Sequence, residues 1–349
     1  MTLPASVVLR LPTLTKIVDH LLEQQSSDEP ASVEATPQTD WAPPTDPVRP
    51  APPAGGNGSA HHRPSPPLEH WLADVATYDL YEAVDGAAQE LGLDSPFFRE
   101  HAALAGATSE VHGRQMINYA SYNYLGLSGH PEVSQAAVQA IERYGTSVSA
   151  SRMVGGERPV HRELEQALAA FLGTEDCLLM VSGHATNVTT LAHLMGPGDL
   201  LLHDALAHDS AVQGASASRA TVKGFSHNDL DDLERLLIEL RPGFERILVY
   251  VEGLYSMDGD YPDLARLTAL KERFHFLLMV DEAHSVGVLG ATGRGLAEHL
   301  GIDRNDPWVL WMGTLSKALA SCGGFLAGSR KLIRFLRHTL PGFVYSVGM

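Results

Sequence analysis

Five short apolar runs, separated by segments with helical periodicity, constrain the fold of this chain more than any other feature of its sequence. We predict them as strands, over residues 177–181, 200–203, 246–251, 276–280 and 308–312. Near-continuous apolar runs are typical of strands that are covered on both faces. Helical patterns, among them residues 229–240 and 264–274, lie between the runs. This alternation predicts an α/β fold with a mostly parallel central sheet and helices on both faces.

Changes of composition divide the 349 residues into zones. Residues 1–22 end in an amphipathic helical pattern, and residues 23–67 are rich in Pro, Ala, Ser, Thr and Gly. We expect this second zone to be a disordered linker, because it cannot bury enough apolar surface to order itself. The composition is globular from residue 68 onward. There we predict an N-terminal helical segment over 68–117 and one large domain over 118–349.

Charge and cysteine content exclude several classes of protein. The formal net charge is −17, from 42 acidic and 25 basic side chains, which disfavours binding to nucleic acid or to an anionic membrane surface. No apolar run approaches the roughly 18–20 residues that span a bilayer, and residues 1–22 lack the basic and long apolar regions typical of a secretory signal, so we expect none. Cys177 and Cys322 form neither a disulfide framework nor a zinc motif. We therefore expect a cytoplasmic protein without a structural metal.

The apolar run 276–280 is followed by Asp281-Glu282-Ala283-His284, which brings a carboxylate and an imidazole to one strand end. One interpretation is a helix N-cap aspartate next to a surface histidine. Another is the DEAH box of an ATP-driven helicase. That box needs a phosphate loop of the form GxxxxGK[ST], which this sequence lacks. The acidic net charge also disfavours a helicase.

Lys317 follows the run 308–312 within the small-residue segment Gly313-Thr314-Leu315-Ser316-Lys317-Ala318. A lone lysine is most often a solvated side chain, but partial desolvation lowers the pKa of an amine and makes it a Schiff-base nucleophile. Asp281 and Lys317 each close a predicted strand, in that order. Pyridoxal phosphate (PLP) needs a carboxylate to keep its pyridine nitrogen protonated and a lysine to hold its aldehyde. The pair therefore predicts PLP as the cofactor.

A candidate phosphate site begins at Ser182-Gly183-His184, directly after the run 177–181. Backbone N–H groups at the start of a helix attract anions, and a glycine there permits close approach of the backbone. An ordinary strand-to-helix turn is the alternative interpretation.

Nine motifs occur in one consistent order between Asn118 and the end of the chain. They are SYNYLGL (121–127), GTSVSASRMVGG (145–156), HRELE (161–165), SGHATN (182–187), DALAHDS (204–210), EGLYSMDGD (252–260), DEAHSVG (281–287), GRG (293–295) and GTLSKALASCGG (313–324). In these motifs the chain resembles the α-oxoamine synthases. These are fold-type I PLP enzymes that include 8-amino-7-oxononanoate synthase, 5-aminolevulinate synthase, 2-amino-3-ketobutyrate ligase and serine palmitoyltransferase.

The resemblance implies four catalytic residues. Lys317 would hold the cofactor as a Schiff base and move protons at the substrate α-carbon. Asp281 would pair with the pyridinium nitrogen, and His284 would lie near the phenolic oxygen of the cofactor. His208 would stack on the face of the ring and help to orient the substrate carboxylate.

The resemblance also implies residues that only bind the cofactor. The amides of Gly183 and His184 and the hydroxyl of Thr314 would hold the phosphate, and Ser256 would lie beside the ring. Relatives continue into a small C-terminal domain that carries an arginine for the substrate carboxylate. That domain is missing here, so we expect the chain to be a fragment whose large domain is incomplete at its C-terminus.

The implied reaction is a decarboxylative condensation of an amino acid with an acyl thioester, which yields an α-aminoketone. Residues 1–22 resemble the end of an acyl carrier protein, so the thioester would come from acyl-CoA or from a carrier, in natural-product biosynthesis. The SYNYLGL motif is closest to serine palmitoyltransferase and favours serine or another small amino acid. The family's active sites lie between subunits, which implies a homodimer. The alternatives are another fold-type I enzyme, either an aminotransferase or an aldolase-like lyase, and a non-catalytic fragment.

Overall fold

The computed structural model describes residues 76–92, 94–95 and 97–349, in two compact units that divide between Glu100 and His101. In the smaller unit, helix α3 (Ala76–Glu90) is followed by a loop in which Ser95 Oγ donates to Asp85 Oδ1 at 2.6 Å. The helix predicted within residues 1–22 and the linker predicted over 23–67 lie outside the described residues.

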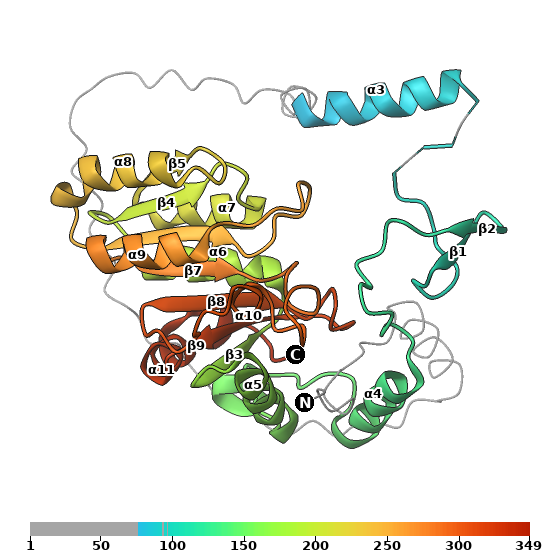
Figure 1. Ribbon diagram of the computed structural model, residues 1–349. Helices are drawn as coiled ribbons and strands as arrows, with labels where there is room; N and C mark the ends of the chain where they lie inside the picture. Colours follow the sequence, from blue (N-terminus) through green and yellow to red (C-terminus); the bar gives the residue numbers. More distant parts are fainter. Residues whose placement is uncertain (1–75, 93, 96) are drawn as a thin grey trace, which may run out of the picture. The chain divides into compact units, whose positions relative to one another are not determined.

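The larger unit begins with a β-hairpin and continues as alternating strands and helices (Figure 1). Its strands are β1 (Thr108–Val111), β2 (Arg114–Ile117), β3 (Asp176–Met180), β4 (Leu200–Asp204), β5 (Thr221–Phe225), β6 (Ile247–Glu252), β7 (Leu277–Asp281), β8 (Val309–Thr314) and β9 (Gly324–Gly328). Its helical elements are α4 (Pro131–Tyr144), the π-helix η2 (Arg152–Gly156), α5 (Pro159–Leu172), α6 (Gly183–Leu194), α7 (Asp209–Ser218), α8 (Leu230–Leu240), the 3₁₀ turn η3 (Arg241–Gly243), α9 (Leu264–Phe274), α10 (Leu296–Leu300), α11 (Arg330–Thr339) and α12 (Pro341–Val344).

Seven of these strands form one sheet in the order β3-β9-β8-β7-β6-β4-β5. The strands from β8 to β5 pair in parallel, and β9 runs antiparallel to both of its neighbours. The predicted α/β fold with a mostly parallel sheet is therefore confirmed. The five strands predicted from apolar runs correspond to β3, β4, β6, β7 and β8, each within two residues at either end. The strands β5 and β9 were not predicted.

Helices cover both faces of the sheet, as predicted, and each face has its own hydrophobic core. Side chains alternate along a strand, so Leu200 and Leu202 of β4 face one core and Leu201 faces the other. The first core also takes apolar residues from α5, α8, α9 and α10. The second takes them from α6, α7, α11 and α12. The strands are thus buried on both sides, which explains their continuous apolar sequences.

The buried carboxylate of Glu165 in α5 fixes elements on both faces of the sheet. Its side chain is fully buried and accepts hydrogen bonds from Arg152 Nη1 at 2.8 Å, Arg337 Nη2 at 2.9 Å and the backbone N–H of Leu179 at 3.1 Å. Although burial acts to raise it, Arg152 and Arg337 hold the pKa of Glu165 below its usual range. One carboxylate therefore joins η2, α5, β3 and α11.

We predict that Glu165→Gln destabilises the protein by about 3 kcal/mol, because it leaves buried guanidinium groups with one carboxylate fewer. Urea unfolding followed by circular dichroism measures the change. Glu239→Gln is the matched control, since Glu239 pairs with Arg235 at 3.3 Å where both side chains are more than 60% exposed. That control should change stability by less than about 0.5 kcal/mol. Equal effects of the two substitutions would contradict the assigned role of Glu165.

Candidate active site

Polar side chains gather where the parallel strands β6, β7 and β8 end. Glu252 and Asp281 are the last residues of β6 and β7, and the sheet register sets them side by side. Thr314 ends β8, and Lys317 follows it after two residues. The carboxyl edge of a parallel sheet is the usual location of a ligand site in this class of fold. Asp281 at the end of β7 and Lys317 in the turn after β8 therefore lie at the same edge of the sheet, next to adjacent strands.

Asp281 is buried, with 4% of its surface exposed, and each of its oxygens accepts a hydrogen bond. Asn187 Nδ2 and the Tyr250 hydroxyl both donate to Oδ2 at 2.8 Å, and the backbone N–H of Ala283 donates to Oδ1 at 2.9 Å. Burial, followed by the charge of Asp281, raises the pKa of Tyr250 well above its usual range. The phenol thus keeps its proton and acts as a donor. These three hydrogen bonds fix the orientation of the buried Asp281 carboxylate at the carboxyl edge of the sheet.

Lys317 lies within hydrogen-bond distance of His284, with 2.8 Å between Nζ and Nε2. Its ammonium also lies 5.7 Å from the centroid of the Tyr122 ring, in cation–π range. Burial lowers the pKa of Lys317, although Asp281 and Glu252 oppose this. Burial and the charge of Lys317 lower the pKa of His284 to about 4. The site thus combines a partly desolvated amine with a neutral imidazole, the arrangement expected of a Schiff-base nucleophile.

His208 is the N-cap residue of α7 and belongs to the same polar network. Its backbone N–H donates to Glu252 Oε1 at 2.6 Å, and its Nδ1 lies 2.7 Å from Ser210 Oγ. Ser210 Oγ in turn accepts from Asn187 Nδ2 at 3.0 Å. Burial and the charge of Asp281 raise the pKa of Glu252 to about 8. The structure therefore connects His208 to Asp281 through two polar residues that sequence analysis did not assign to the site.

The start of α6 lies against the end of β8. A Cβ atom built on Gly183 would lie 3.0 Å from Thr314 Oγ1, so the glycine allows this close approach. Thr314 Oγ1 donates to the Gly323 carbonyl at 2.9 Å. Gly183 and His184 open a 12-residue helix, and the N–H groups at a helix start attract anions. The structure thus brings together the three residues predicted to hold a phosphate.

A pocket of about 380 Å³ adjoins His284. Its lining comes from the loops after β6 and β7 and from the segment around residue 124: Tyr124, Leu254, Tyr255, Ser256, Gly259, His284, Gly287 and Val288. Ser256, predicted from sequence to lie beside the cofactor ring, shares this pocket with His284. All eight predicted site residues thus lie at the carboxyl edge of the sheet or in the loops next to it.

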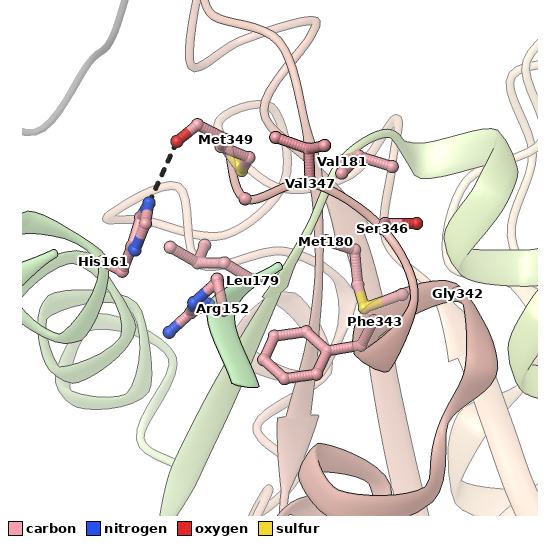
Figure 2. Close-up of a pocket in the computed structure, with 11 residues that line it drawn as sticks. Arg152, His161, Leu179, Met180, Val181, Gly342, Phe343, Ser346, Val347 and Met349 are labelled. Atoms are coloured by element: carbon pink, nitrogen blue, oxygen red, sulfur yellow. Dashed lines mark hydrogen bonds between the residues drawn. The ribbon is translucent and has the colours of Figure 1, made fainter. Parts of the chain in front are cut away.

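A second cavity, of about 10 Å³, lies between η2, α5, β3 and the segment after α12 (Figure 2). It is closed in part by a hydrogen bond of 3.0 Å between His161 Nε2 and the Met349 carbonyl. A volume of this size holds about one water molecule. None of the predicted site residues lines it.

Sequence analysis did not assign Asn187, Ser210, Tyr250 or Glu252 to the site, although each belongs to the polar network around Asp281. Asn187 stands in the SGHATN motif, but nothing in its spacing connected it to Asp281, 94 residues later. Tyr250 lies inside the run predicted over 246–251, where the pattern gave its hydroxyl no distinct role. Within the described residues, no group of His, Cys, Asp or Glu is arranged to hold a metal ion. No helix among those residues is long and apolar enough to cross a membrane.

His227 contacts the loop that carries Ser256, through Asp260 and Tyr255. The His227 ring contacts Asp204 Oδ1 at 2.8 Å through Nδ1 and Asp260 Oδ2 at 3.0 Å through Nε2. The edge of the imidazole also packs on Tyr255, with ring centroids 4.5 Å apart. Although burial acts to lower it, the two carboxylates raise the pKa of His227. The imidazole therefore bridges the end of β4 and the loop after β6.

We predict a loss of stability on the alkaline side that depends on His227. Because its folded pKa is raised, its contribution is complete below its unfolded pKa of about 6.5 and is lost as the pH rises through the folded pKa. The melting temperature of the unaltered protein should fall between pH 6 and pH 9. In His227→Gln this fall should be about 2 °C smaller. Scanning fluorimetry measures it. His299→Gln, which alters an exposed histidine near Tyr261, should retain the full drop, and the same result for both variants would contradict the prediction.

Residues 114–349 match the protein family described as aminotransferase class I and II. The chain is 45% identical over 251 residues to a putative 8-amino-7-oxononanoate synthase of Gloeobacter violaceus, an alignment that covers 72% of this chain and 64% of the relative. It is 44% identical over 256 residues to an 8-amino-7-oxononanoate synthase of Geotalea daltonii, again with 72% and 64% covered. The chain thus spans slightly less than two thirds of the length of these curated relatives.

Solved structures of serine palmitoyltransferases share the fold. The enzyme of Sphingomonas wittichii superposes with a TM-score of 0.73 at 30% identity, over 78% of this chain and 68% of that one. The enzyme of S. paucimobilis, solved with a bound PLP–myriocin aldimine, gives a TM-score of 0.73 at 29% identity, with the same coverage.

Proposed function

We propose a function for this chain, which belongs to the aminotransferase class I and II family and is similar to its α-oxoamine synthases. We propose that it is a PLP-dependent acyltransferase that condenses an amino acid with an acyl thioester, releases carbon dioxide and forms an α-aminoketone. One observation carries the proposal: Asp281 ends β7 as a buried carboxylate, and Lys317 lies in the turn after the adjacent parallel strand β8 as a partly desolvated amine.

The residues at the sheet edge fit PLP. A carboxylate aimed by three donors suits a protonated pyridine nitrogen, and an amine of lowered pKa suits the aldehyde. Gly183 leaves room beside Thr314 that a side chain at that position would fill. When bound, PLP supplies an electron sink for negative charge at the α-carbon of the substrate.

In this proposal the chain supplies binding, orientation and proton transfer. Asp281 keeps the pyridine nitrogen protonated, and Lys317 holds the cofactor and moves a proton at the substrate α-carbon. His284 lies near the phenolic oxygen. His208, whose backbone is tied to Glu252, covers the ring and orients the substrate carboxylate.

Four residues complete the cofactor site in this proposal. The N–H groups of Gly183 and His184 and the hydroxyl of Thr314 bind the phosphate, and Ser256 lies beside the ring. The helix N-terminus supports the phosphate assignment because its unpaired N–H groups and its dipole both favour an anion.

The substrates belong to the proposal as well. The similarity to 8-amino-7-oxononanoate synthases and to serine palmitoyltransferases supports an acyl thioester as one substrate and an amino acid as the other. We propose serine or another small amino acid, a thioester of coenzyme A or of a carrier protein, a homodimer and a cytoplasmic location. A role in natural-product biosynthesis rests on the carrier-like residues 1–22, which lie outside the described part of the chain.

We predict that borohydride reduction after incubation with PLP leaves a pyridoxyl adduct on the peptide that contains Lys317. Peptide mass spectrometry identifies the site. Lys317→Ala should abolish the adduct, and Lys331→Ala, which alters an exposed lysine of α11, should retain it. An adduct that persists on another lysine in Lys317→Ala at equal yield would contradict the cofactor assignment.

We predict that Asp281→Asn lowers the rate of α-aminoketone formation at least about 100-fold, because the carboxylate that keeps the pyridine nitrogen protonated is lost. Carbon dioxide release from serine with an acyl thioester measures the rate. Carbon dioxide release that occurs only when the acyl thioester is present supports the proposed condensation. Conversion of the amino acid with a 2-oxo acid instead, without any thioester, would identify an aminotransferase.

A further inference from the structure

Three side chains form a continuous line from the interior of the site to its surface. Lys317 Nζ lies 2.8 Å from His284 Nε2, and His284 Nδ1 lies 2.9 Å from the Tyr124 hydroxyl. Tyr124 is 41% exposed, whereas Lys317 and His284 are partly buried. The line therefore begins at a half-buried amine and ends at a hydroxyl that reaches solvent.

The ring of His284 can hold only one proton at neutral pH, because burial and Lys317 lower its pKa to about 4. One ring nitrogen is then a donor and the other an acceptor. While Lys317 is an ammonium group it can only donate, so Nε2 accepts and Nδ1 carries the proton. Burial raises the pKa of Tyr124, so its hydroxyl stays protonated and can accept from Nδ1 or donate to it.

We propose that Tyr124, His284 and Lys317 form a proton relay, in which the Tyr124 hydroxyl fixes the tautomer of His284 and connects the Lys317 amine to solvent. When the ammonium of Lys317 gives a proton to Nε2, Nδ1 releases its own proton to the Tyr124 oxygen, and the Tyr124 hydroxyl proton passes to water. The amine ends neutral, the imidazole and the phenol each keep one proton, and one proton reaches solvent. Tyr124 acts through His284 and is therefore a positioning residue.

The relay has a fixed geometry because the segment of Tyr124 is anchored on both sides. Asn123 Nδ2 donates to the Ala105 carbonyl at 2.9 Å, and Asn123 Oδ1 accepts from the N–H of Ser128 at 3.0 Å. Leu125 packs on the loop after β7, where a Cβ built on Gly287 would lie 3.3 Å from Leu125 Cδ1. The hydroxyl of Tyr124 is thus held at hydrogen-bond distance from Nδ1 of His284.

Other charged or titratable groups act on the same amine, and they define the controls. Asp281 and Glu252 act to raise the pKa of Lys317, and His208 acts to lower the pKa of His284. Tyr122 presents its ring to the Lys317 ammonium at 5.7 Å, and the hydroxyl has no part in this contact. Tyr122 therefore provides a matched tyrosine on the same segment.

The test measures the acid–base behaviour of Lys317 in the full 349-residue chain after any bound PLP has been removed. A trace of acetic anhydride is added between pH 6 and pH 11, and the labelling of Lys317 is followed by peptide mass spectrometry. Tyr124→Phe should move the midpoint of this pH profile down by about half a pH unit, the shift expected from the loss of one hydrogen bond to the imidazole that stabilises the ammonium. Tyr122→Phe should leave the midpoint in place.

A double-mutant cycle separates a relay from a merely structural role of Tyr124. In the His284→Gln background, Tyr124→Phe should add less than about 0.2 of a pH unit, because Tyr124 acts only through His284. Additive shifts, or a midpoint in Tyr124→Phe equal to that of the unaltered chain, would overturn the proposal. Imidazole ¹⁵N spectra give a second measurement. They should show His284 protonated at Nδ1 in the unaltered chain and a redistributed tautomer in Tyr124→Phe. The experiment contains no cofactor, so its outcome is independent of the proposed reaction.

Discussion

The rest of the site depends on one buried negative charge, that of Asp281. An unpaired carboxylate inside a protein is costly, and it persists only where donors replace the water that it has lost. Here β6 contributes the phenol of Tyr250, α6 contributes the amide of Asn187, and the turn after β7 contributes a backbone N–H. The placement of α6 on its face of the sheet is therefore an electrostatic requirement as well as a packing solution.

The same amide extends the influence of Asp281 beyond its own strand. Asn187 also contacts Ser210, whose hydroxyl meets the ring of His208, and the backbone of His208 is bound by Glu252. Residues from four separate motifs, that of Asp281 included, are thus joined by hydrogen bonds in which side chains take part. Motifs that are far apart in the sequence meet because each follows a strand whose carboxyl end lies at the same edge of the sheet.

Sequence periodicity was enough to predict the strands that bear the chemistry, because β3, β4, β6, β7 and β8 are buried on both faces and carry unbroken apolar runs. It did not predict β5, which lies at the sheet edge with mostly exposed residues, or β9, which is bounded by glycines. Asp281 and Lys317 could be predicted because each follows such a run. Tyr250 could not, since a tyrosine inside an apolar strand has the same pattern whether or not its hydroxyl meets a carboxylate.

The two faces of the sheet also differ in whether apolar substitutions there would affect the polar network around Asp281. Tyr250, Asn187 and Ser210 all belong to the face covered by α6 and α7. The opposite face, under α8 and α9, contributes apolar side chains such as Leu233 and Leu267 to its core. Libraries that exchange apolar residues of equal volume under α8 and α9 would therefore change the rigidity of that core. They would leave the hydrogen bonds of Tyr250, Asn187 and Ser210 intact. The same libraries under α6 and α7 would change the packing around Tyr250, Asn187 and Ser210, and with it the geometry of the hydrogen bonds to Asp281.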